Sequence, residues 1–176
     1  PHNGHIQISE DAIKKLNLHE VWWIVAQTHP DKNFINEKNF LERLNNAKKI
    51  PKNCKIKVIE NLNYCNNKYT YNNLNKLTEC SDEISFVFLM GADNLLNFHY
   101  WYKWEKIFEL MPIAVFDRPN YKNSSLSSKS AKKFRQFKYL EKLSKLLPDL
   151  KPPAWIYFHG KQNYIKSSNI RKNNGS

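Results

Sequence analysis

The sequence lacks most of the features that would place it outside the class of ordinary folded domains. Its three cysteines, Cys54, Cys65 and Cys80, form neither a CxxC pair nor a Cys/His ligand pattern. This excludes a disulfide framework and a zinc site and leaves reduced thiols as the expectation. No apolar run reaches the roughly 18 residues that a membrane-spanning helix needs, and no signal peptide is visible. We therefore expect one soluble, cytoplasmic domain over residues 1–176, long enough to bury a core.

Arginine is scarce although the chain is strongly basic. Only four of the 28 basic residues are Arg, and the formal net charge is +12. Asn, Lys, Ile and Tyr are abundant, a bias that an AT-rich genome also produces, and no RRM, KH or zinc-finger signature accompanies the charge. Nucleic-acid binding is therefore the weaker interpretation. The positive charge would still attract an anionic substrate such as a nucleotide.

Short apolar runs alternate with segments of helical period. Near-continuous apolar character is typical of strands buried on both faces of a parallel sheet. Segments of helical spacing occupy residues 5–16, 36–50 and 70–79. This alternation predicts an α/β fold with a Rossmann-like, doubly wound parallel sheet of about five strands. The five predicted strands are residues 21–26, 56–60, 84–90, 113–117 and 155–159.

Residues 120–150 interrupt the alternation. A polar, serine-rich stretch, NYKNSSLSSKS, predicts a loop over 120–130. The next stretch predicts a helix over 131–147 with a lysine-rich outer face, packed on the sheet, and a membrane-lying helix is the alternative. Its apolar face would carry Phe134, Phe137, Leu140, Leu143 and Leu147.

Both ends of the chain differ from a complete sheet of this kind. Such a sheet begins with a strand, whereas the first predicted helix starts at about residue 5. We expect the first strand to be missing from the chain as given. The final residues, RKNNGS, stop about one turn into a further predicted helix.

Two stretches predict anion sites at helix N-termini. The chain opens with PHNGH, so the free amides of the first turn, Gly4 and two imidazoles could face a phosphate. A solvated terminus or a tag remnant explains the same five residues. The second stretch, IKSSNIR, places Ser167 or Ser168 at an N-cap with Arg171 one turn further on. Helix starts in a doubly wound sheet meet at the carboxyl edge, so both could hold one phosphate chain.

The stretch MGADNLLNFHYWYKW follows the third predicted strand directly. Asp93 would lie at the carboxyl end of that strand, where its carboxylate could accept both hydroxyls of a ribose. Capping of the following helix is the alternative role for Asp93. Of the neighbouring rings Trp101 and Tyr102, only one can be buried, which leaves the other free to stack on a ligand.

Together these motifs resemble the bacterial nicotinate-nucleotide adenylyltransferases of the HxGH nucleotidyltransferase superfamily. The motifs HNGH, VWWIVAQTHPDK, YTYNNL, GADNLLNFHYWYKW, VFDRP and IKSSNIR occur in the family's order and spacing over nearly the whole chain. The resemblance implies transfer of AMP from ATP to nicotinic acid mononucleotide, giving deamido-NAD and pyrophosphate in NAD biosynthesis. It also implies Mg²⁺ accompanying ATP, and no residue of this chain is assigned as a metal ligand.

The resemblance implies three overlapping sets of site residues. His2, His5, Lys32 and Arg171 would act on the phosphates during transfer, without a covalent intermediate. The nicotinate nucleotide would contact Tyr69, Thr70, Trp101, Tyr102 and Arg118. ATP would contact His2, Gly4, His5, Gly91, Asp93, Ser167, Ser168 and Arg171.

The sequence departs from the family pattern at three places, and several alternatives stay open. The family's first strand and loop are absent before Pro1, the helices after Arg171 are absent, and Lys166 replaces the first Ser of the ISSTxIR motif. The acceptor could instead be nicotinamide mononucleotide or another acceptor of the superfamily. A non-catalytic nucleotide- or RNA-binding remnant of the fold is the alternative from a different class. Self-association into a homo-oligomer stays open.

Overall fold

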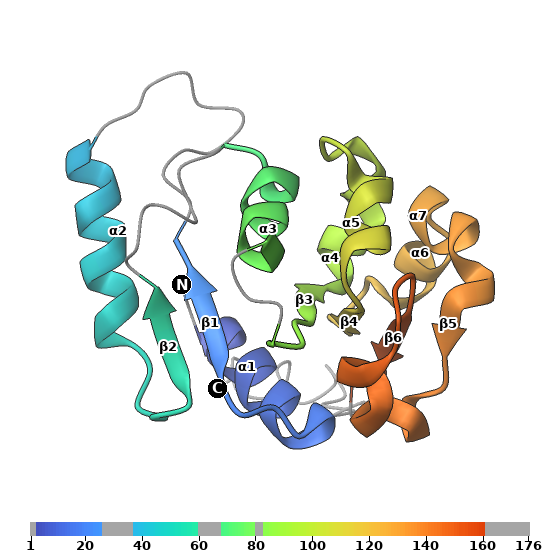
Figure 1. Cartoon of the computed structure of the whole chain (residues 1–176), viewed down its shortest axis with the longest axis horizontal. Helices are drawn as coiled ribbons and strands as arrows, with labels where there is room; N and C mark the ends of the chain where they lie inside the picture. Colours follow the sequence, from blue (N-terminus) through green and yellow to red (C-terminus); the bar gives the residue numbers. More distant parts are fainter. Residues whose placement is uncertain (1–2, 26–36, 60–67, 80–82, 161–176) are drawn as a thin grey trace, which may run out of the picture.

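Parallel strands and helices alternate along the part of the chain that the computed structural model describes, residues 3–25, 37–59, 68–79 and 83–160 (Figure 1). The first half contains α1 (Asn3–Leu16), β1 (Val21–Ile24), α2 (Glu37–Lys49), β2 (Ile56–Ile59) and α3 (Thr70–Glu79). The second half begins with β3 (Phe88–Gly91), α4 (Ala92–Asn97), the 3₁₀ helix η1 (Phe98–Tyr100), α5 (Trp104–Leu110) and β4 (Ile113–Phe116). It ends with α6 (Lys122–Leu126), α7 (Lys129–Lys133), η2 (Arg135–Phe137), β5 (Lys138–Tyr139), η3 (Glu141–Asp149) and β6 (Trp155–Phe158).

The described strands form two parallel sheets. The smaller sheet pairs β1 with β2, and the larger has the order β3-β4-β6-β5. In the larger sheet Gly91 is in register with Phe116, so β3 and β4 end at the same level. β1 and β3 are edge strands: among the strands of the described ranges, β1 pairs only with β2, and β3 pairs only with β4. The α/β class and the parallel sheet predicted from the sequence are thus confirmed.

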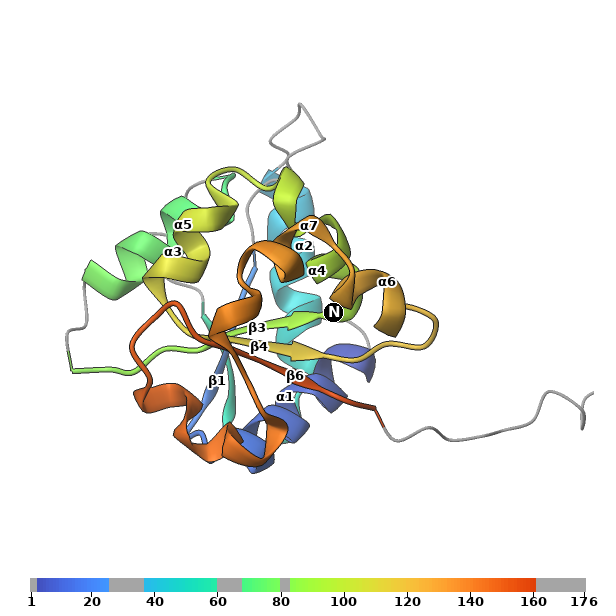
Figure 2. The same ribbon diagram turned by 90° about the vertical axis from the view of Figure 1, so that its right-hand side faces the viewer.

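The larger sheet is covered on both faces because its strands alternate their side chains between them. Figure 2 shows α3, α4, α5 and α7 on one side of β3, β4 and β6, with α1 and η3 on the other. The first face buries an aromatic-rich core that includes Phe98, Phe108, Val115, Trp155 and Tyr157. The second buries Ala12, Leu16, Phe116, Leu147, Ile156 and Phe158. This is the doubly wound arrangement that the apolar runs predict.

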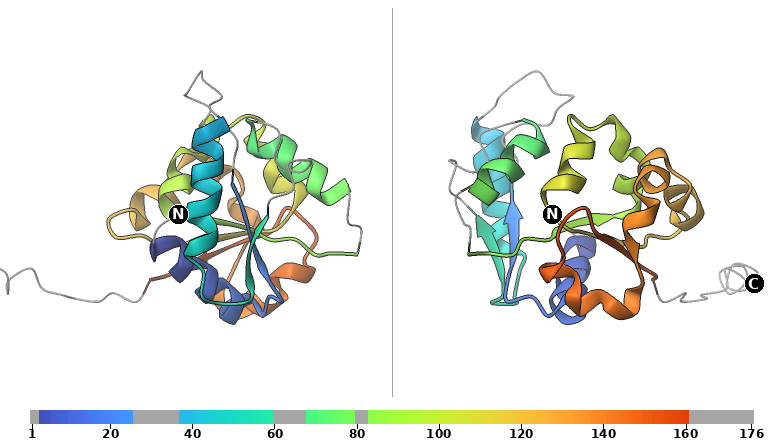
Figure 3. Two further views of the ribbon diagram at one scale, coloured as in Figure 1. Left: turned by 90° about the vertical axis from the view of Figure 1, so that its left-hand side faces the viewer. Right: turned by 45° about the vertical axis from the view of Figure 1, so that its right-hand side comes forward.

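The smaller sheet has a thinner core. Val21 and Ile56 are buried neighbours across β1 and β2, and Leu44 and Ala47 of α2 are buried as well. Figure 3 shows α2 beside these two strands, at the end of the molecule opposite to η3 and β5. None of the helices in the described ranges is long and apolar enough to cross a membrane.

The prediction of one helix over residues 131–147 is wrong. This stretch forms the end of α7, then η2, the two-residue strand β5 and most of η3. Its apolar residues serve opposite faces of the sheet: Phe134 stacks on Phe108 at 4.1 Å between ring centroids, whereas Leu147 packs beneath the sheet with Leu16. A straight helix cannot reach both faces, so the chain turns around the sheet edge and adds β5 there. Leu140 is left 63% exposed.

The serine-rich stretch predicted as a loop over 120–130 forms α6 and the start of α7. Three of its serines are buried because their hydroxyls are used internally. Ser128 caps α7 by accepting a hydrogen bond from the Ala131 N–H at 3.2 Å. Ser130 donates to the carbonyl of Leu95 at 2.8 Å and so ties α7 to α4. Ser125 lies in contact with the Tyr157 hydroxyl.

Candidate functional site

The carboxyl ends of β3, β4 and β6 bring polar groups to one edge of the larger sheet. Gly91 ends β3, Asp117 follows β4, and His159 follows β6. Asp93 lies two residues beyond β3, in the first turn of α4. Ligands of open parallel sheets bind at this edge, where loops and helix starts converge. The sequence-predicted residues Gly91, Asp93 and Arg118 therefore lie where a nucleotide site is expected.

Asp93 and Arg118 form an ion pair directly over Gly91. Arg118 Nε lies 3.1 Å from Asp93 Oδ1, and each side chain is 31% exposed. Oδ1 is enclosed and makes no hydrogen bond within the described ranges, so Arg118 neutralises it by charge rather than by an aligned bond. Asp93 does not cap α4, because Gly91 occupies the N-cap position without a side-chain hydrogen bond. The capping alternative for Asp93 is therefore excluded.

Gly91 leaves space for this ion pair. A β-carbon there would overlap Asp93 Oδ1 and lie 2.8 Å from Arg118 Nε, closer than real β-carbons approach. The backbone of Gly91 is extended, with φ −81° and ψ 159°, so any residue could adopt it. The absence of a side chain, rather than conformational freedom, thus lets the ion pair lie against the strand end.

Asp117 is held in place by Tyr157 and by the chain that leaves β6. The Tyr157 hydroxyl donates to Asp117 Oδ1 at 2.7 Å, and the Gly160 N–H donates to Oδ2 at 3.3 Å. Burial raises the pKa of Tyr157 most, the Ser125 hydroxyl lowers it, and Asp117 raises it again. The net pKa lies well above its usual range, so the phenol keeps its proton and remains a donor to Asp117.

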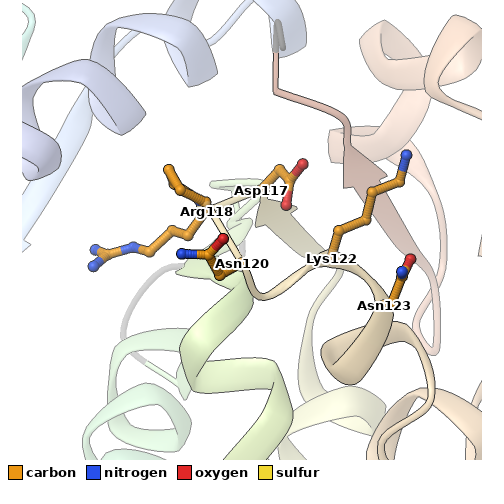
Figure 4. A pocket seen from close by; sticks show the side chains of 6 residues that line it. Asp117, Arg118, Asn120, Lys122 and Asn123 are labelled. Atoms are coloured by element: carbon orange, nitrogen blue, oxygen red, sulfur yellow. The ribbon is translucent and has the colours of Figure 1, made fainter. Parts of the chain in front are cut away.

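A hollow of about 340 Å³ opens beside the turn that follows β4. Its lining is polar and comes from a single stretch of chain. Figure 4 shows Arg118 extending to one side of this turn and Lys122 to the other. The hollow is lined by Asp117, Arg118, Pro119, Asn120, Lys122 and Asn123. Its two cations make it suited to an anionic or hydroxyl-rich group.

The first turn of α1 carries Gly4 and His5. His5 is exposed, and its ring meets Trp23 of β1 edge to face at 6.3 Å between centroids. The Trp23 indole donates to the buried Ser9 hydroxyl at 2.9 Å, one turn further along α1. Trp23 therefore fixes α1 against β1 and flanks the His5 ring.

The residues predicted for the nicotinate nucleotide meet between α3 and α5. Tyr69 immediately precedes α3, and its ring lies against that of Tyr102 with centroids 4.4 Å apart and an interplanar angle of 30°. Thr70 is the first residue of α3. Trp101 is partly buried and packs edge to face on Phe98 at 5.1 Å, whereas Tyr102 is 44% exposed. Neither ring is fully buried, and Trp101 is the more covered of the two.

Two lysines accompany these rings. The Lys68 ammonium lies 4.9 Å from the centre of the Tyr69 ring, within cation–π distance. Lys103 lies 4.9 Å from the Tyr71 ring and 5.3 Å from the Tyr102 ring. We call Tyr69, Tyr71, Tyr102, Lys68 and Lys103 the tyrosine–lysine cluster. It has the chemistry to receive a flat ring that carries a negative charge.

Five predicted site residues lie outside the described ranges: His2, Lys32, Ser167, Ser168 and Arg171. Among the others, the structure brings Asp93 together with Arg118 and Tyr69 together with Tyr102. The sequence reasoning missed Lys103, Tyr71 and the Tyr157–Asp117 pair. Tyr71 could have been found from its place in YTY, but the remaining contacts depend on the fold.

The described ranges contain no cluster of three or more His, Cys, Asp or Glu side chains that could hold a metal ion. Asp93 is paired with Arg118, and Asp117 accepts hydrogen bonds from Tyr157 and Gly160. Such engaged carboxylates suit Mg²⁺ only as an ion that keeps its waters and arrives with substrate phosphates.

Comparison with known proteins gives one consistent family. The cytidylyltransferase-like family model matches residues 1–173. Relatives called "Probable nicotinate-nucleotide adenylyltransferase" include one from Brucella suis, 34% identical over 98% of this chain and 89% of the relative. Others are from Agrobacterium fabrum, at 35% over 98% and 92%, and Mesorhizobium japonicum, at 37% over 98% and 88%.

Solved structures agree on the fold. A Plasmodium falciparum nicotinic acid mononucleotide adenylyltransferase complexed with NaAD is 24% identical, with a TM-score of 0.56, covering 96% of this chain and 75% of that one. The same enzyme complexed with APC is 22% identical, with a TM-score of 0.51 over 94% and 76%. Together with the family model and the curated relatives, this shows that the chain belongs to the cytidylyltransferase-like family and, within it, to the nicotinate-nucleotide adenylyltransferases.

Proposed function

We propose that the protein transfers AMP from ATP to nicotinic acid mononucleotide, producing deamido-NAD and pyrophosphate as a step of NAD biosynthesis. One observation carries the proposal: relatives named for this activity match 97–100% of the chain at 34–37% identity. The polar strand ends and the aromatic cluster support it. They provide a carboxylate for a ribose and flat rings for a pyridine within one domain.

The reaction needs no nucleophile from the protein. A phosphate oxygen of the mononucleotide attacks the α-phosphorus of ATP, forming a new P–O bond. The bond from that phosphorus to the oxygen that bridges to the β-phosphate breaks, and pyrophosphate leaves with the bonding electrons. The attacking phosphate is largely ionised at neutral pH, so no general base is required. Catalysis then rests on positioning and on stabilising charge at the α-phosphate.

We assign phosphate stabilisation to the start of α1. His5 is exposed in its first turn, where imidazole N–H groups and free helix amides can donate to phosphate oxygens. By resemblance, His2 acts beside it, and Lys32 and Arg171 neutralise the departing pyrophosphate. Ser167 and Ser168 contribute hydroxyl donors to the same phosphates. Mg²⁺ enters as part of the substrate, bound to ATP oxygens.

Asp93 receives the adenosine ribose in this proposal. A carboxylate at the end of a parallel strand can accept both ribose hydroxyls. The absence of a side chain on Gly91 lets a substrate approach the strand end. Oδ1 lies under Arg118, so accepting two ribose hydroxyls requires the guanidinium to shift. Arg118 then becomes available to the second substrate.

The pyridine nucleotide occupies the other half of the site. The rings of Trp101 and Tyr102 and the Tyr69–Thr70 segment are the groups that the pyridine would contact. A cytoplasmic location, where ATP is available, is part of the proposal. Self-association into a homo-oligomer remains an expectation.

Pyrophosphate release tests the proposal directly. The purified protein is supplied with ATP and Mg²⁺ and either nicotinic acid mononucleotide or nicotinamide mononucleotide. We expect turnover with the acid form and much slower turnover with the amide. Comparable rates with both acceptors would correct the substrate. ATP binding without turnover on either, together with RNA affinity that falls steeply with salt, would favour the non-catalytic alternative.

A further inference from the structure

The tyrosine–lysine cluster offers a way to distinguish the two pyridine mononucleotides. These molecules differ at one ring substituent, which is a carboxylate in the acid form and a neutral amide in the other. A positive charge near that substituent therefore favours the acid form. The inference below rests on the proposed function, because it concerns the pyridine end of that site.

Lys103 has an unusual backbone conformation. Its φ of 51° and ψ of 36° place it in the left-handed region, which non-glycine residues rarely occupy. It directly follows Tyr102 and is the N-cap residue of α5, where its carbonyl accepts from the Ile107 N–H at 3.3 Å. This conformation points the side chain back over Tyr71 and Tyr102.

Local stability does not account for a lysine at this position. Asn, Asp, Ser and Gly are the preferred N-cap residues, and Asn and Gly also tolerate the left-handed region. A cation at a helix N-terminus is further disfavoured by the helix dipole. Lys103 is unfavourable on all three counts. A residue that costs stability at a predicted binding loop points to a role in binding.

The charge of Lys103 is also left uncompensated. Its ammonium lies over two tyrosine rings, and it pairs with no carboxylate of the described ranges. Its neighbour Lys106, one turn along α5, is instead paired with Glu109 at 2.8 Å. Lys133 likewise pairs with Glu105 of α5. The Lys103 ammonium is therefore available to a ligand, on an exposed side chain.

Lys68 adds a second positive charge to the same group of rings. Its ammonium lies over Tyr69, and the Tyr69 ring lies against that of Tyr102. Each ammonium group therefore contacts one ring of the Tyr69–Tyr102 pair, next to the Trp101–Tyr102 segment predicted to receive the pyridine. A carboxylate bound near these ammonium groups would gain an attraction that an amide would not.

We infer that Lys103 is a specificity-determining residue that selects the carboxylate of nicotinic acid mononucleotide over the amide, with Lys68 in a supporting role. Cation–π contacts hold the ammonium at the rim of the site, and the carboxylate completes its coordination when the substrate binds. Selection therefore acts on the acid form alone. The neutral amide loses nothing when the charge is removed.

The test compares kcat/KM for the two mononucleotides in four proteins: wild type, Lys103→Asn, Lys103→Arg and Lys106→Gln. Asn removes the charge but suits both the left-handed conformation and the N-cap, so the loop should keep its shape. Arg retains the charge. Lys106→Gln is the matched control, because it removes a neighbouring lysine whose charge Glu109 already neutralises.

We expect Lys103→Asn to lower kcat/KM for the acid form about tenfold and to leave the amide within about twofold, the range of one partly exposed charged contact. Lys103→Arg and Lys106→Gln should keep the wild-type preference, and raising the salt concentration should weaken it. An equal loss for both mononucleotides, or an unchanged ratio in Lys103→Asn, overturns the inference alone. No turnover by the wild-type protein with either mononucleotide overturns the proposed function and the inference with it.

Discussion

The Arg118 guanidinium and the Asp93 carboxylate meet 3.1 Å apart above the α-carbon of Gly91. The two residues come from the ends of neighbouring strands and are assigned to different substrates. Their contact therefore joins the ribose end of the proposed site to the pyridine end. Because both side chains are about one-third exposed, the pair contributes little to stability, and its importance lies in placing the carboxylate.

Gly91→Ala should distinguish the effect of the Asp93–Arg118 pair on activity from its effect on the stability of the protein. The added methyl would overlap Asp93 Oδ1 and crowd Arg118 Nε, so both side chains must move. We expect the KM for ATP to rise at least several-fold, whereas the free energy of unfolding should fall by less than about 1 kcal/mol, because both displaced side chains are partly exposed and can move. Steady-state kinetics and urea unfolding measure the two effects.

Gly160→Ala is the matched control for that substitution. A β-carbon at Gly160 would lie 3.6 Å from Asp117, which is an ordinary contact distance. The control should stay within about 0.5 kcal/mol of the wild type. If Gly91→Ala behaved like Gly160→Ala in both assays, the close packing over Gly91 would have no functional meaning.

The strands were predictable from the sequence because burial on both faces leaves a direct signal. The runs IAVF and WIYF are fully buried in β4 and β6, at the positions predicted for them. The predicted strand over 84–90 is shorter in the structure, since β3 starts only at Phe88, where pairing with β4 begins. The start of a strand depends on its pairing partner, and the sequence of the strand itself does not show which strand that partner is.

The stretch after α6 could not be predicted for a related reason. Phe134, Phe137 and Leu147 have helical spacing, but they pack on different faces of the sheet. Periodicity shows that residues share a face only if the chain continues straight. Here the Phe134 carbonyl accepts a hydrogen bond from the Trp155 indole at 2.8 Å, a tertiary contact that helps to end α7.

The site was predictable in its parts but not in its contacts. Asp93, Arg118, Tyr69 and Tyr102 were identified through motifs, yet their pairing depends on which strands and helices lie side by side. The positive φ of Lys103 could not be predicted from the sequence, because Lys has no preference for that conformation.

Tyr157→Phe should destabilise the turn that holds Asp117. The substitution removes the 2.7 Å hydrogen bond to Asp117 Oδ1 from a phenol that is 1% exposed. We expect the free energy of unfolding to fall by about 1–2 kcal/mol at pH 7. Tyr139→Phe, on an exposed edge strand, should have almost no effect.

The same residue predicts a loss of stability at alkaline pH. The native pKa of Tyr157 is raised well above its ordinary value of about 10. Above pH 10 the unfolded chain therefore releases this proton while the native protein retains it, so stability falls as the pH rises further. The loss should approach about 1.4 kcal/mol per pH unit. Tyr157→Phe should remove that contribution, and identical alkaline slopes in both proteins would contradict the assignment.

Glu141 predicts a smaller effect at acid pH. Burial raises its pKa, but the Lys15 ammonium at 2.8 Å and the His159 backbone and ring lower it, and the net pKa is below the usual range. This contribution is present above the ordinary pKa of about 4.3 and is lost as the pH falls below it.

Because Glu141 is more than one-third exposed, we expect Glu141→Gln to cost less than about 1 kcal/mol at pH 7 and less still at pH 3. Chemical denaturation at the two pH values measures the difference. Glu109→Gln, which breaks an exposed i,i+3 pair, serves as the comparison. An equal cost at both pH values would indicate a packing effect rather than an electrostatic one.

His5→Ala tests the phosphate-binding role of the first helix. His5 is an exposed surface residue, so its removal should change the free energy of unfolding by less than about 1 kcal/mol. If its imidazole donates to the α-phosphate as charge develops there, turnover should fall on the order of a hundredfold. The KM for the mononucleotide should stay near the wild-type value, because the lost interaction belongs to the transition state.

Two further variants decide how that result is interpreted. His19→Ala removes another exposed histidine, just beyond the far end of α1, and should leave kcat unchanged. Trp23→Phe keeps an aromatic ring beside His5 but loses the indole hydrogen bond to Ser9. It should lower kcat less than His5→Ala and reduce stability by about 1 kcal/mol. A near-normal kcat in His5→Ala at saturating substrates would show that His5 does not act in the chemical step, because losing a contact made only in the transition state must lower kcat.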